Sequence, residues 1–116
     1  MGQVFTEGRH TAEFLITEGN GTISREQGKL DASAAALEPG TLLGKVTATG
    51  DLIAYSNAAS DGSQTAVGIL YARAPDLAVD QRVTYIARHA EVKANALTGL
   101  DAAGTADLLA LGIVCR

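Results

Sequence analysis

Two short apolar runs, each interrupted by a glycine, constrain the fold of this chain more than any other feature. They occupy residues 39–46 (Pro-Gly-Thr-Leu-Leu-Gly-Lys-Val) and 65–71 (Thr-Ala-Val-Gly-Ile-Leu-Tyr). Runs of this length beside turn-forming residues are typical of strands. The second run is apolar on both alternating faces, which predicts a strand buried on both sides, inside a barrel or at a subunit contact. One face holds Val67, Ile69 and Tyr71, and the other holds Ala66, Gly68 and Leu70.

The core of such a domain must be built from small aliphatic side chains. The 116 residues provide for one domain. Hydrophobic residues make up 47% of the chain, but aromatic residues only 4%, so the core consists mainly of Leu, Val, Ile and Ala. Each small side chain buries little area, at about 25 cal/mol per Å². This composition suggests further burial through self-association.

Turn residues and alternating patterns divide the remaining chain into short elements. Residues 38–41 (Glu-Pro-Gly-Thr) predict a type II turn, because proline and glycine suit its two central positions. We expect a mainly β domain with one or two short helices. Its strands are predicted at 14–17, 24–30, 42–48, 52–55, 65–71 and 113–115.

Two further features refine this prediction. Apolar residues between positions 82 and 93 change from one alternating face to the other. A strand does this only through an extra residue, which predicts a β-bulge or corner near Arg88 and His89. Residues 105–111 predict a short helix, with Thr105 as its N-cap and Gly112 at its C-terminal end.

Charge and apolar run lengths argue against several partners. The net charge is −4 and the nine basic residues are scattered, whereas a nucleic-acid-binding module clusters them. We therefore expect no nucleic-acid partner. No apolar run reaches 18 residues and the N-terminus lacks a basic-then-apolar pattern, so we expect no membrane association and no signal peptide.

The reactive side chains do not form a chemical motif. His10 and His89 lie far apart in sequence, outside any metal-ligand spacing, and are expected to be solvated. Cys115 lies in an apolar stretch and is interpreted as a small buried hydrophobe. The aspartate pairs, Asp76 with Asp80 and Asp101 with Asp107, are interpreted as solvated surface groups. We expect no metal, no cofactor and no enzymatic activity.

The first 26 residues form a polar, glycine-rich segment that carries a few apolar side chains. We expect residues 1–26 to be an extended N-terminal arm and residues 27–116 to be the β-rich domain. The polar, glycine-rich arm provides few apolar neighbours for Phe5 and for the cluster at 14–16 (Phe-Leu-Ile). They either fold back on the domain or dock on a partner by strand addition.

The order and spacing of several stretches resemble those of a known family. Glu-Gly-Asn-Gly-Thr-Ile-Ser-Arg-Glu at 18–26 precedes Glu-Pro-Gly-Thr-Leu-Leu-Gly-Lys-Val at 38–46. Asp-Gly at 61–62, Ala-Val-Gly-Ile-Leu at 66–70 and Arg-His-Ala-Glu-Val at 88–92 follow, and then a short helix with Leu-Gly-Ile-Val at 111–114. From about residue 18 onward, the chain resembles the head decoration proteins of lambda-like tailed phages.

The resemblance implies a β-clip-like fold and a structural role. Members of the family form homotrimers on the outside of the expanded capsid and stabilise the shell against DNA pressure. Their N-terminal arm adds a strand to the major capsid protein. The implied location is the outer surface of the virion, after synthesis in the host cytoplasm. In this sequence the implied capsid-binding residues are Val4, Phe5, Phe14, Leu15, Ile16, Thr17, Ser24, Arg25 and Glu26.

Two alternatives stay open on the sequence. One is a trimeric β-clip-type enzyme or ligand-binding module with sites at subunit interfaces, which would group charged residues with glycine near strand ends. The other is an assembly adaptor, or a fragment of a larger phage structural protein.

Overall fold

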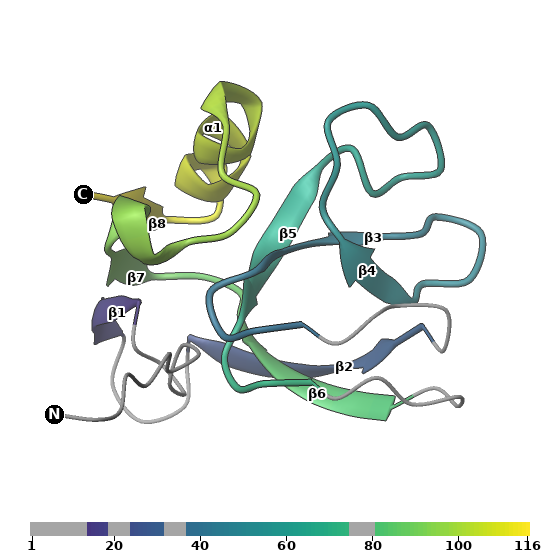
Figure 1. Ribbon diagram of the computed structural model, residues 1–116, viewed down its shortest axis with the longest axis horizontal. Coiled ribbons are helices and arrows are strands. Elements are labelled where there is room, and N and C mark those ends of the chain that lie inside the picture. The colour runs from purple at the N-terminus through teal and green to yellow at the C-terminus, as the bar shows by residue number, and fades with distance from the viewer. Residues whose placement is uncertain (1–13, 19–23, 32–36, 75–80) are drawn as a thin grey trace, which may run out of the picture.

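The computed structural model describes residues 14–18, 24–31, 37–74 and 81–116. It is mainly β, with one short helix, as expected from the sequence (Figure 1). The elements are β1 (Leu15–Glu18), β2 (Arg25–Leu30), β3 (Leu42–Lys45), β4 (Leu52–Ala54), β5 (Ala66–Leu70), β6 (Gln81–Ile86), β7 (Ala90–Val92), the 3-10 turn η1 (Ala94–Ala96), α1 (Ala102–Ala110) and β8 (Ile113–Cys115).

Five strands close into a barrel in the order β2-β4-β3-β5-β6, and β6 returns to pair with β2. The β2–β6 pair is antiparallel and runs from Arg25 opposite Ile86 to Leu30 opposite Gln81. The contact between β2 and β4 is parallel and consists of Leu30 opposite Leu52. Closure matters because it leaves none of these five strands as a free sheet edge.

A three-stranded sheet in the order β1-β7-β8 lies beside the barrel together with α1 (Figure 1). β1 runs antiparallel to β7, and β8 runs parallel to β7. α1 packs on both β8 and the barrel strand β5. The helix therefore joins the small sheet to the barrel.

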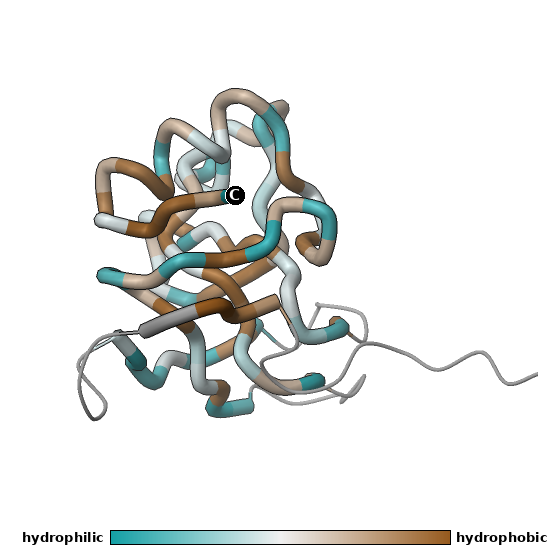
Figure 2. The backbone as a smooth tube through the Cα atoms, turned by 90° about the vertical axis from the view of Figure 1, so that its left-hand side faces the viewer, coloured by the Kyte–Doolittle hydropathy of each residue, from teal (hydrophilic) through white to brown (hydrophobic). Residues whose placement is uncertain are grey.

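The described residues form two hydrophobic clusters. The barrel interior contains Leu30, Leu43, Leu52, Leu70, Ala74, Val83, Tyr85 and Ala87. The second core lies between the barrel wall, the small sheet and α1, and contains Phe14, Leu42, Tyr55, Ala66, Ile69, Ile86, Ala90, Val92, Ala96, Leu97, Leu108 and Ile113. Figure 2, viewed from the side of the small sheet, shows hydrophobic segments interspersed with hydrophilic ones along the backbone.

The wall between the two clusters is formed by β3, β5 and β6. On β3 and β5, and at the end of β6, neighbouring residues point to opposite clusters, as in the pair Ile69 (second core) and Leu70 (barrel interior). Both side chains are fully buried, and burying one such side chain contributes about 1.5–3 kcal/mol. Earlier in β6, Arg82 and Thr84 alternate with the buried Val83 and Tyr85 and belong to neither cluster. The predicted two-sided burial of residues 65–71 is confirmed, because one set of side chains faces the barrel interior and the other faces the second core.

The glycines that interrupt the two apolar runs are places of close approach. A Cβ atom on Gly68 would lie 2.5 Å from the Tyr85 ring and 2.6 Å from the Ile86 carbonyl oxygen. A Cβ atom on Gly44 would lie 2.5 Å from the Ser63 carbonyl oxygen. Neighbouring backbone and ring atoms therefore occupy the space that a side chain would need.

The predicted assignment of faces in β5 was wrong at its first two residues. Ala66 belongs to the second core, while Val67 packs against the barrel interior. The pairing with β3 shifts between Gly68 opposite Leu43 and Ala66 opposite Gly44, which leaves Val67 as an extra residue. This β-bulge reverses the alternation, an effect that a strict period of two cannot show.

The predicted corner near residues 88 and 89 is confirmed. β6 ends at Ile86 in the barrel, and β7 begins at Ala90 in the small sheet. Between them His89 adopts a positive φ of 51°, and its side chain is exposed. The change of apolar face in the sequence thus marks the point where the chain leaves the barrel.

The predicted helix was placed three residues too late. Asp101, rather than Thr105, is the N-cap, and its carboxylate accepts the Gly104 N–H at 2.7 Å. Thr105 lies in the first turn and donates its hydroxyl to the Asp101 carbonyl oxygen. Gly104 is a poor helix former, but it is buried against Leu42 and Tyr55, so tertiary packing outweighs intrinsic propensity here.

Two aspartates predicted to be solvated instead attach α1 to the barrel. The Tyr55 hydroxyl donates to Asp101 Oδ1 at 2.9 Å, and the Ala66 N–H donates to Asp107 Oδ2 at 3.0 Å. Tyr55 is only 7% exposed. Burial, followed by its hydrogen bond to Asp101, raises the pKa of Tyr55 to about 12.

The remaining sequence predictions mostly hold. The turn at 38–41 is present, with Gly40 at a φ of +93° and the Thr41 N–H bonded to the Glu38 carbonyl oxygen. The strand predicted at 42–48 ends at Lys45, and its hairpin with β4 is confirmed. Asp76, Asp80 and His10 lie outside the described residues.

We predict that the stability conferred by Tyr55 is lost at alkaline pH. The folded-state pKa of about 12 exceeds the ordinary value of 10.0, so this contribution is full below pH 10 and disappears as the pH rises through 12. The difference in unfolding free energy between the wild type and Tyr55→Phe should therefore narrow over that range in chemical denaturation experiments. A constant difference would show that Tyr55 titrates normally.

Candidate functional site

The described residues of the predicted contact set lie around the junction of β1, the corner before β7 and the start of β2. Glu18 of β1 pairs with Ala90 of β7, and the Ser24 hydroxyl before β2 donates to the His89 carbonyl oxygen at 2.8 Å. The N-terminal end of β2 is thereby held next to the small sheet. Val4 and Phe5 lie outside the described residues.

Phe14 is an anchor in the second core rather than a surface residue. Its side chain is 0% exposed, and its carbonyl oxygen accepts the Lys93 N–H at 2.8 Å. Leu15 is half-buried and packs against the same core. Of the two alternatives left open by the sequence, these two side chains follow the one in which the cluster folds back on the domain.

Ile16 is the exposed member of the cluster, with 44% of its surface accessible. Leu15 lies opposite Val92 and Thr17 lies opposite Glu91, so Ile16 is the extra residue of a bulge in β1. A bulge redirects a side chain and disturbs the regular ladder. Among the described strands β1 pairs with β7 alone, which makes it an edge of the small sheet carrying an exposed apolar side chain.

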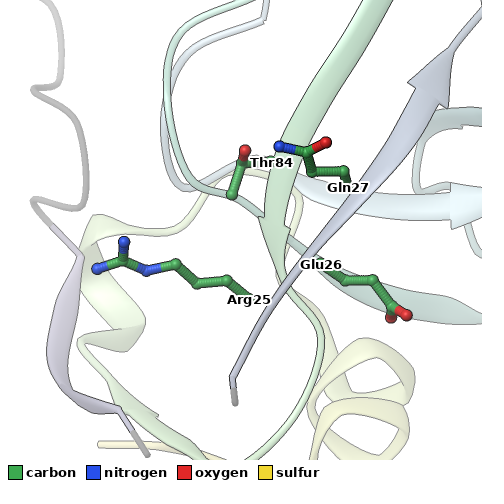
Figure 3. A pocket seen from close by; sticks show the side chains of 4 residues that line it. All are labelled: Arg25, Glu26, Gln27 and Thr84. Atoms are coloured by element: carbon green, nitrogen blue, oxygen red, sulfur yellow. The ribbon is translucent and has the colours of Figure 1, made fainter. Parts of the chain in front are cut away.

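The start of β2 combines one structural residue with two surface residues. Ser24 is fully buried, and its carbonyl oxygen accepts the Ala87 N–H at 2.8 Å in addition to the bond made by its hydroxyl. Arg25 and Glu26 follow and extend to opposite sides of β2, as expected for alternating strand residues (Figure 3). The predicted boundary between residues 26 and 27 thus falls inside β2.

Each of these two charged residues has a partner on the barrel. The Arg25 guanidinium lies 4.4 Å from the centre of the Tyr71 ring, a cation–π contact of about 0.5–1 kcal/mol at an exposed site. Arg88 Nη2 lies 2.7 Å from Glu26 Oε2, and such surface ion pairs contribute about 0–1 kcal/mol. Both contacts orient the side chains while adding little stability.

A polar pocket of about 370 Å³ opens on this part of the barrel (Figure 3). It is lined by Arg25, Glu26 and Gln27 of β2 and by Thr84 of β6, and Thr84 lies opposite Gln27 in the strand pairing. The sequence prediction did not include Gln27 or Thr84. The polar run of β2 (Arg-Glu-Gln-Gly-Lys) was the available signal for an outward-facing strand surface.

The described residues contain neither a cluster of metal-ligating side chains nor a helix long enough to span a membrane. In the four described ranges, no three His, Cys, Asp or Glu side chains gather as metal ligands would. Within the same ranges, the one helix is too short to cross a bilayer. Cys115 is half-buried against the second core rather than fully buried, and burial raises the pKa of its thiol.

This arrangement is that of a small β-rich protein with an exposed apolar side chain and a polar pocket near one sheet edge. Comparison with family models identifies its relatives: the model for bacteriophage lambda head decoration protein D matches residues 4–113. The chain therefore belongs to that family of phage head decoration proteins. Comparison with curated proteins found no match.

Family membership confirms the resemblance found in the sequence and fixes the broad role. The family consists of structural proteins of the phage capsid, so the chain is a phage head decoration protein with a virion location. The alternative of an enzyme or ligand-binding module has less support, because the match spans nearly the whole chain.

We predict that Phe14 and Ile16 differ sharply in their effect on stability. Phe14→Ala should lower the unfolding free energy by about 3–5 kcal/mol, because it leaves a cavity in the second core. Ile16→Ala should change it by less than about 0.5 kcal/mol, as is usual for surface substitutions. Chemical denaturation of both variants checks this. A Phe14→Ala variant as stable as the wild type would contradict the anchoring of β1.

Proposed function

We propose that this protein binds the outer surface of the expanded phage capsid as a homotrimer and stabilises the shell against the pressure of packaged DNA. The observation that carries the proposal is the family match over residues 4–113. The net charge of −4 is compatible with an exterior position beside a DNA-filled shell, because an acidic surface does not capture DNA.

The proposed contact with the major capsid protein is made by the N-terminal segment, residues 1–26. Three features support this choice. β1 is a sheet edge, and an edge can accept or donate backbone hydrogen bonds to a strand of a partner. Ile16 presents apolar area at that edge, and the nearby pocket adds polar groups. Val4, Phe5 and Thr17 remain part of the proposed contact set.

Phe14, Leu15 and Ser24 enter the proposal in a different role. Because they are buried or half-buried, they hold the segment in place instead of touching the capsid protein first. Among the members of the set whose burial the structure describes, Ile16 and Glu26 are exposed, and Arg25 is partly exposed. The proposed surface thus stands on a rigid base formed by the second core.

Weak individual contacts are sufficient if three copies bind together. A backbone hydrogen bond contributes about 0.5–1.5 kcal/mol net, so one edge strand binds weakly. Joining three such segments in one trimer makes the second and third contacts intramolecular, which can raise the overall affinity by about 100-fold or more. The proposed homotrimer therefore serves attachment as well as the burial suggested by the aliphatic composition.

The decisive experiment is co-sedimentation of the protein with expanded capsids of its own phage that lack decoration. The wild type should pellet with the capsids, and cryo-electron microscopy of those capsids should show it in groups of three copies. Deletion of residues 1–13 should abolish pelleting while leaving Phe14, and therefore the fold, in place. Deletion through residue 17 is uninformative for binding, because it also removes the Phe14 anchor.

A matched pair of charge substitutions tests the surface itself. Ile16→Glu should weaken capsid binding by at least about tenfold, because each of three subunits carries the change. Leu109→Glu is the control, since Leu109 is also an exposed large apolar side chain, 61% accessible, but lies on α1. Folded wild type that does not pellet would overturn the capsid proposal. Equal binding by all variants would overturn only the contact surface.

A further inference from the structure

The loop between β4 and β5 contains an Asp-Gly pair at positions 61 and 62, the one such pair in the sequence. Asp-Gly is the aspartyl sequence most prone to isomerise, because glycine leaves its backbone nitrogen unhindered. The reaction inserts an extra methylene into the main chain. The stability of this pair in the folded protein depends on how the loop holds its two reacting groups.

The loop requires both residues of the pair. Gly62 has a φ of +111°, and a Cβ atom there would lie 2.6 Å from the Lys45 carbonyl oxygen. Asp61 Oδ1 accepts the Ser63 N–H at 3.0 Å and the Ser63 hydroxyl at 2.6 Å. Ser63 is 1% exposed and lies against Gly44 of β3, so its donors need a partner. A reactive dipeptide is thus the consequence of the packing.

Isomerisation begins when the Gly62 backbone nitrogen attacks Cγ of Asp61. The new N–C bond forms as a carboxyl oxygen leaves, and the carboxyl oxygen, its proton and the amide proton depart as water. The resulting five-membered succinimide is then hydrolysed. When water adds at the α-carbonyl, the original peptide bond breaks, and Gly62 stays linked through Cγ, giving isoaspartate.

The native hydrogen bonds oppose this attack at both reacting groups. The Gly62 N–H donates to Gln64 Oε1 at 2.8 Å, so the nucleophile is engaged. The two Ser63 donors hold the carboxylate, and the hydrogen bonds from Ser63 lower the pKa of Asp61. The ionised carboxylate is a poor electrophile, because an oxide would have to leave in place of water.

The backbone on either side is also fixed. The Asp61 carbonyl oxygen accepts the Thr47 N–H at 2.8 Å, and the Ser63 carbonyl oxygen accepts the Ser56 N–H at 3.2 Å. Any rotation about the Asp61 Cα–C bond that moves the Gly62 nitrogen also moves the Asp61 carbonyl oxygen, so it would disturb the hydrogen bond with the Thr47 N–H. Reaction therefore requires the loop to open locally.

We propose that Asp61–Gly62 is a latent isoaspartate site which Ser63, Gln64 and the anchored loop backbone keep unreactive in the folded protein. Isoaspartate at position 61 then marks molecules whose β4–β5 loop has opened. This inference is independent of capsid binding and holds for the purified protein alone.

The test is to age the full chain at neutral pH, folded in buffer and unfolded in guanidinium chloride. Isoaspartate at position 61 is then quantified by chromatography and fragmentation mass spectrometry of the peptide. The folded protein should isomerise at least about tenfold more slowly, because reaction waits on loop opening. Equal rates in the two samples would overturn the proposal without any variant.

Two glutamine-to-alanine variants test whether the hydrogen bond from the Gly62 N–H to Gln64 slows isomerisation. Gln64→Ala should isomerise several-fold faster than the folded wild type, since the Gly62 N–H is released. Gln27→Ala is the control, because Gln27 is also exposed but lies on β2. Thermal melting establishes that both variants are folded. If Gln64→Ala forms isoaspartate at position 61 at the same rate as Gln27→Ala, Gln64 does not protect the site and the proposal fails as stated.

Discussion

Burial of β3 and β5 on both faces is the interaction on which the rest of the molecule depends. Each strand sends neighbouring side chains into different clusters, as Leu42 and Leu43 do in β3. A one-residue slip of any of them would exchange the contents of both clusters at once. The barrel, the small sheet and α1 are therefore bound to one wall, and we expect them to unfold together.

The same wall also determines which apolar side chains around β1 are buried and which are exposed. Phe14 reaches the second core because the outer face of the wall supplies an apolar surface for it, while Ile16 is turned outward by the bulge in β1. Phe14 therefore stabilises the second core, while Ile16 is exposed and belongs to the proposed contact surface. Ser24 completes the arrangement, since it joins the start of β2 to the corner at His89.

Local patterns predicted the features that depend on neighbours in sequence. The turn at Gly40, the corner at His89 and the two-sided burial of β5 all follow from residue type and alternation. The start of α1 was missed because Gly104 is unfavourable alone and is accepted only through its packing against Tyr55. The anchoring of Phe14 and the pocket at Thr84 were missed because they join residues that are distant along the chain.

The anchoring of Phe14 also sets a geometric limit. Since that side chain is fixed in the core, the position of Phe14 relative to the small sheet is defined. Phe5 precedes it by nine residues, and nine residues span at most about 32 Å even when fully extended. The proposed capsid site for Phe5 therefore lies within that distance of Phe14, and the spacing of the three Phe14 anchors in the proposed homotrimer would determine which lattice positions can be engaged at once.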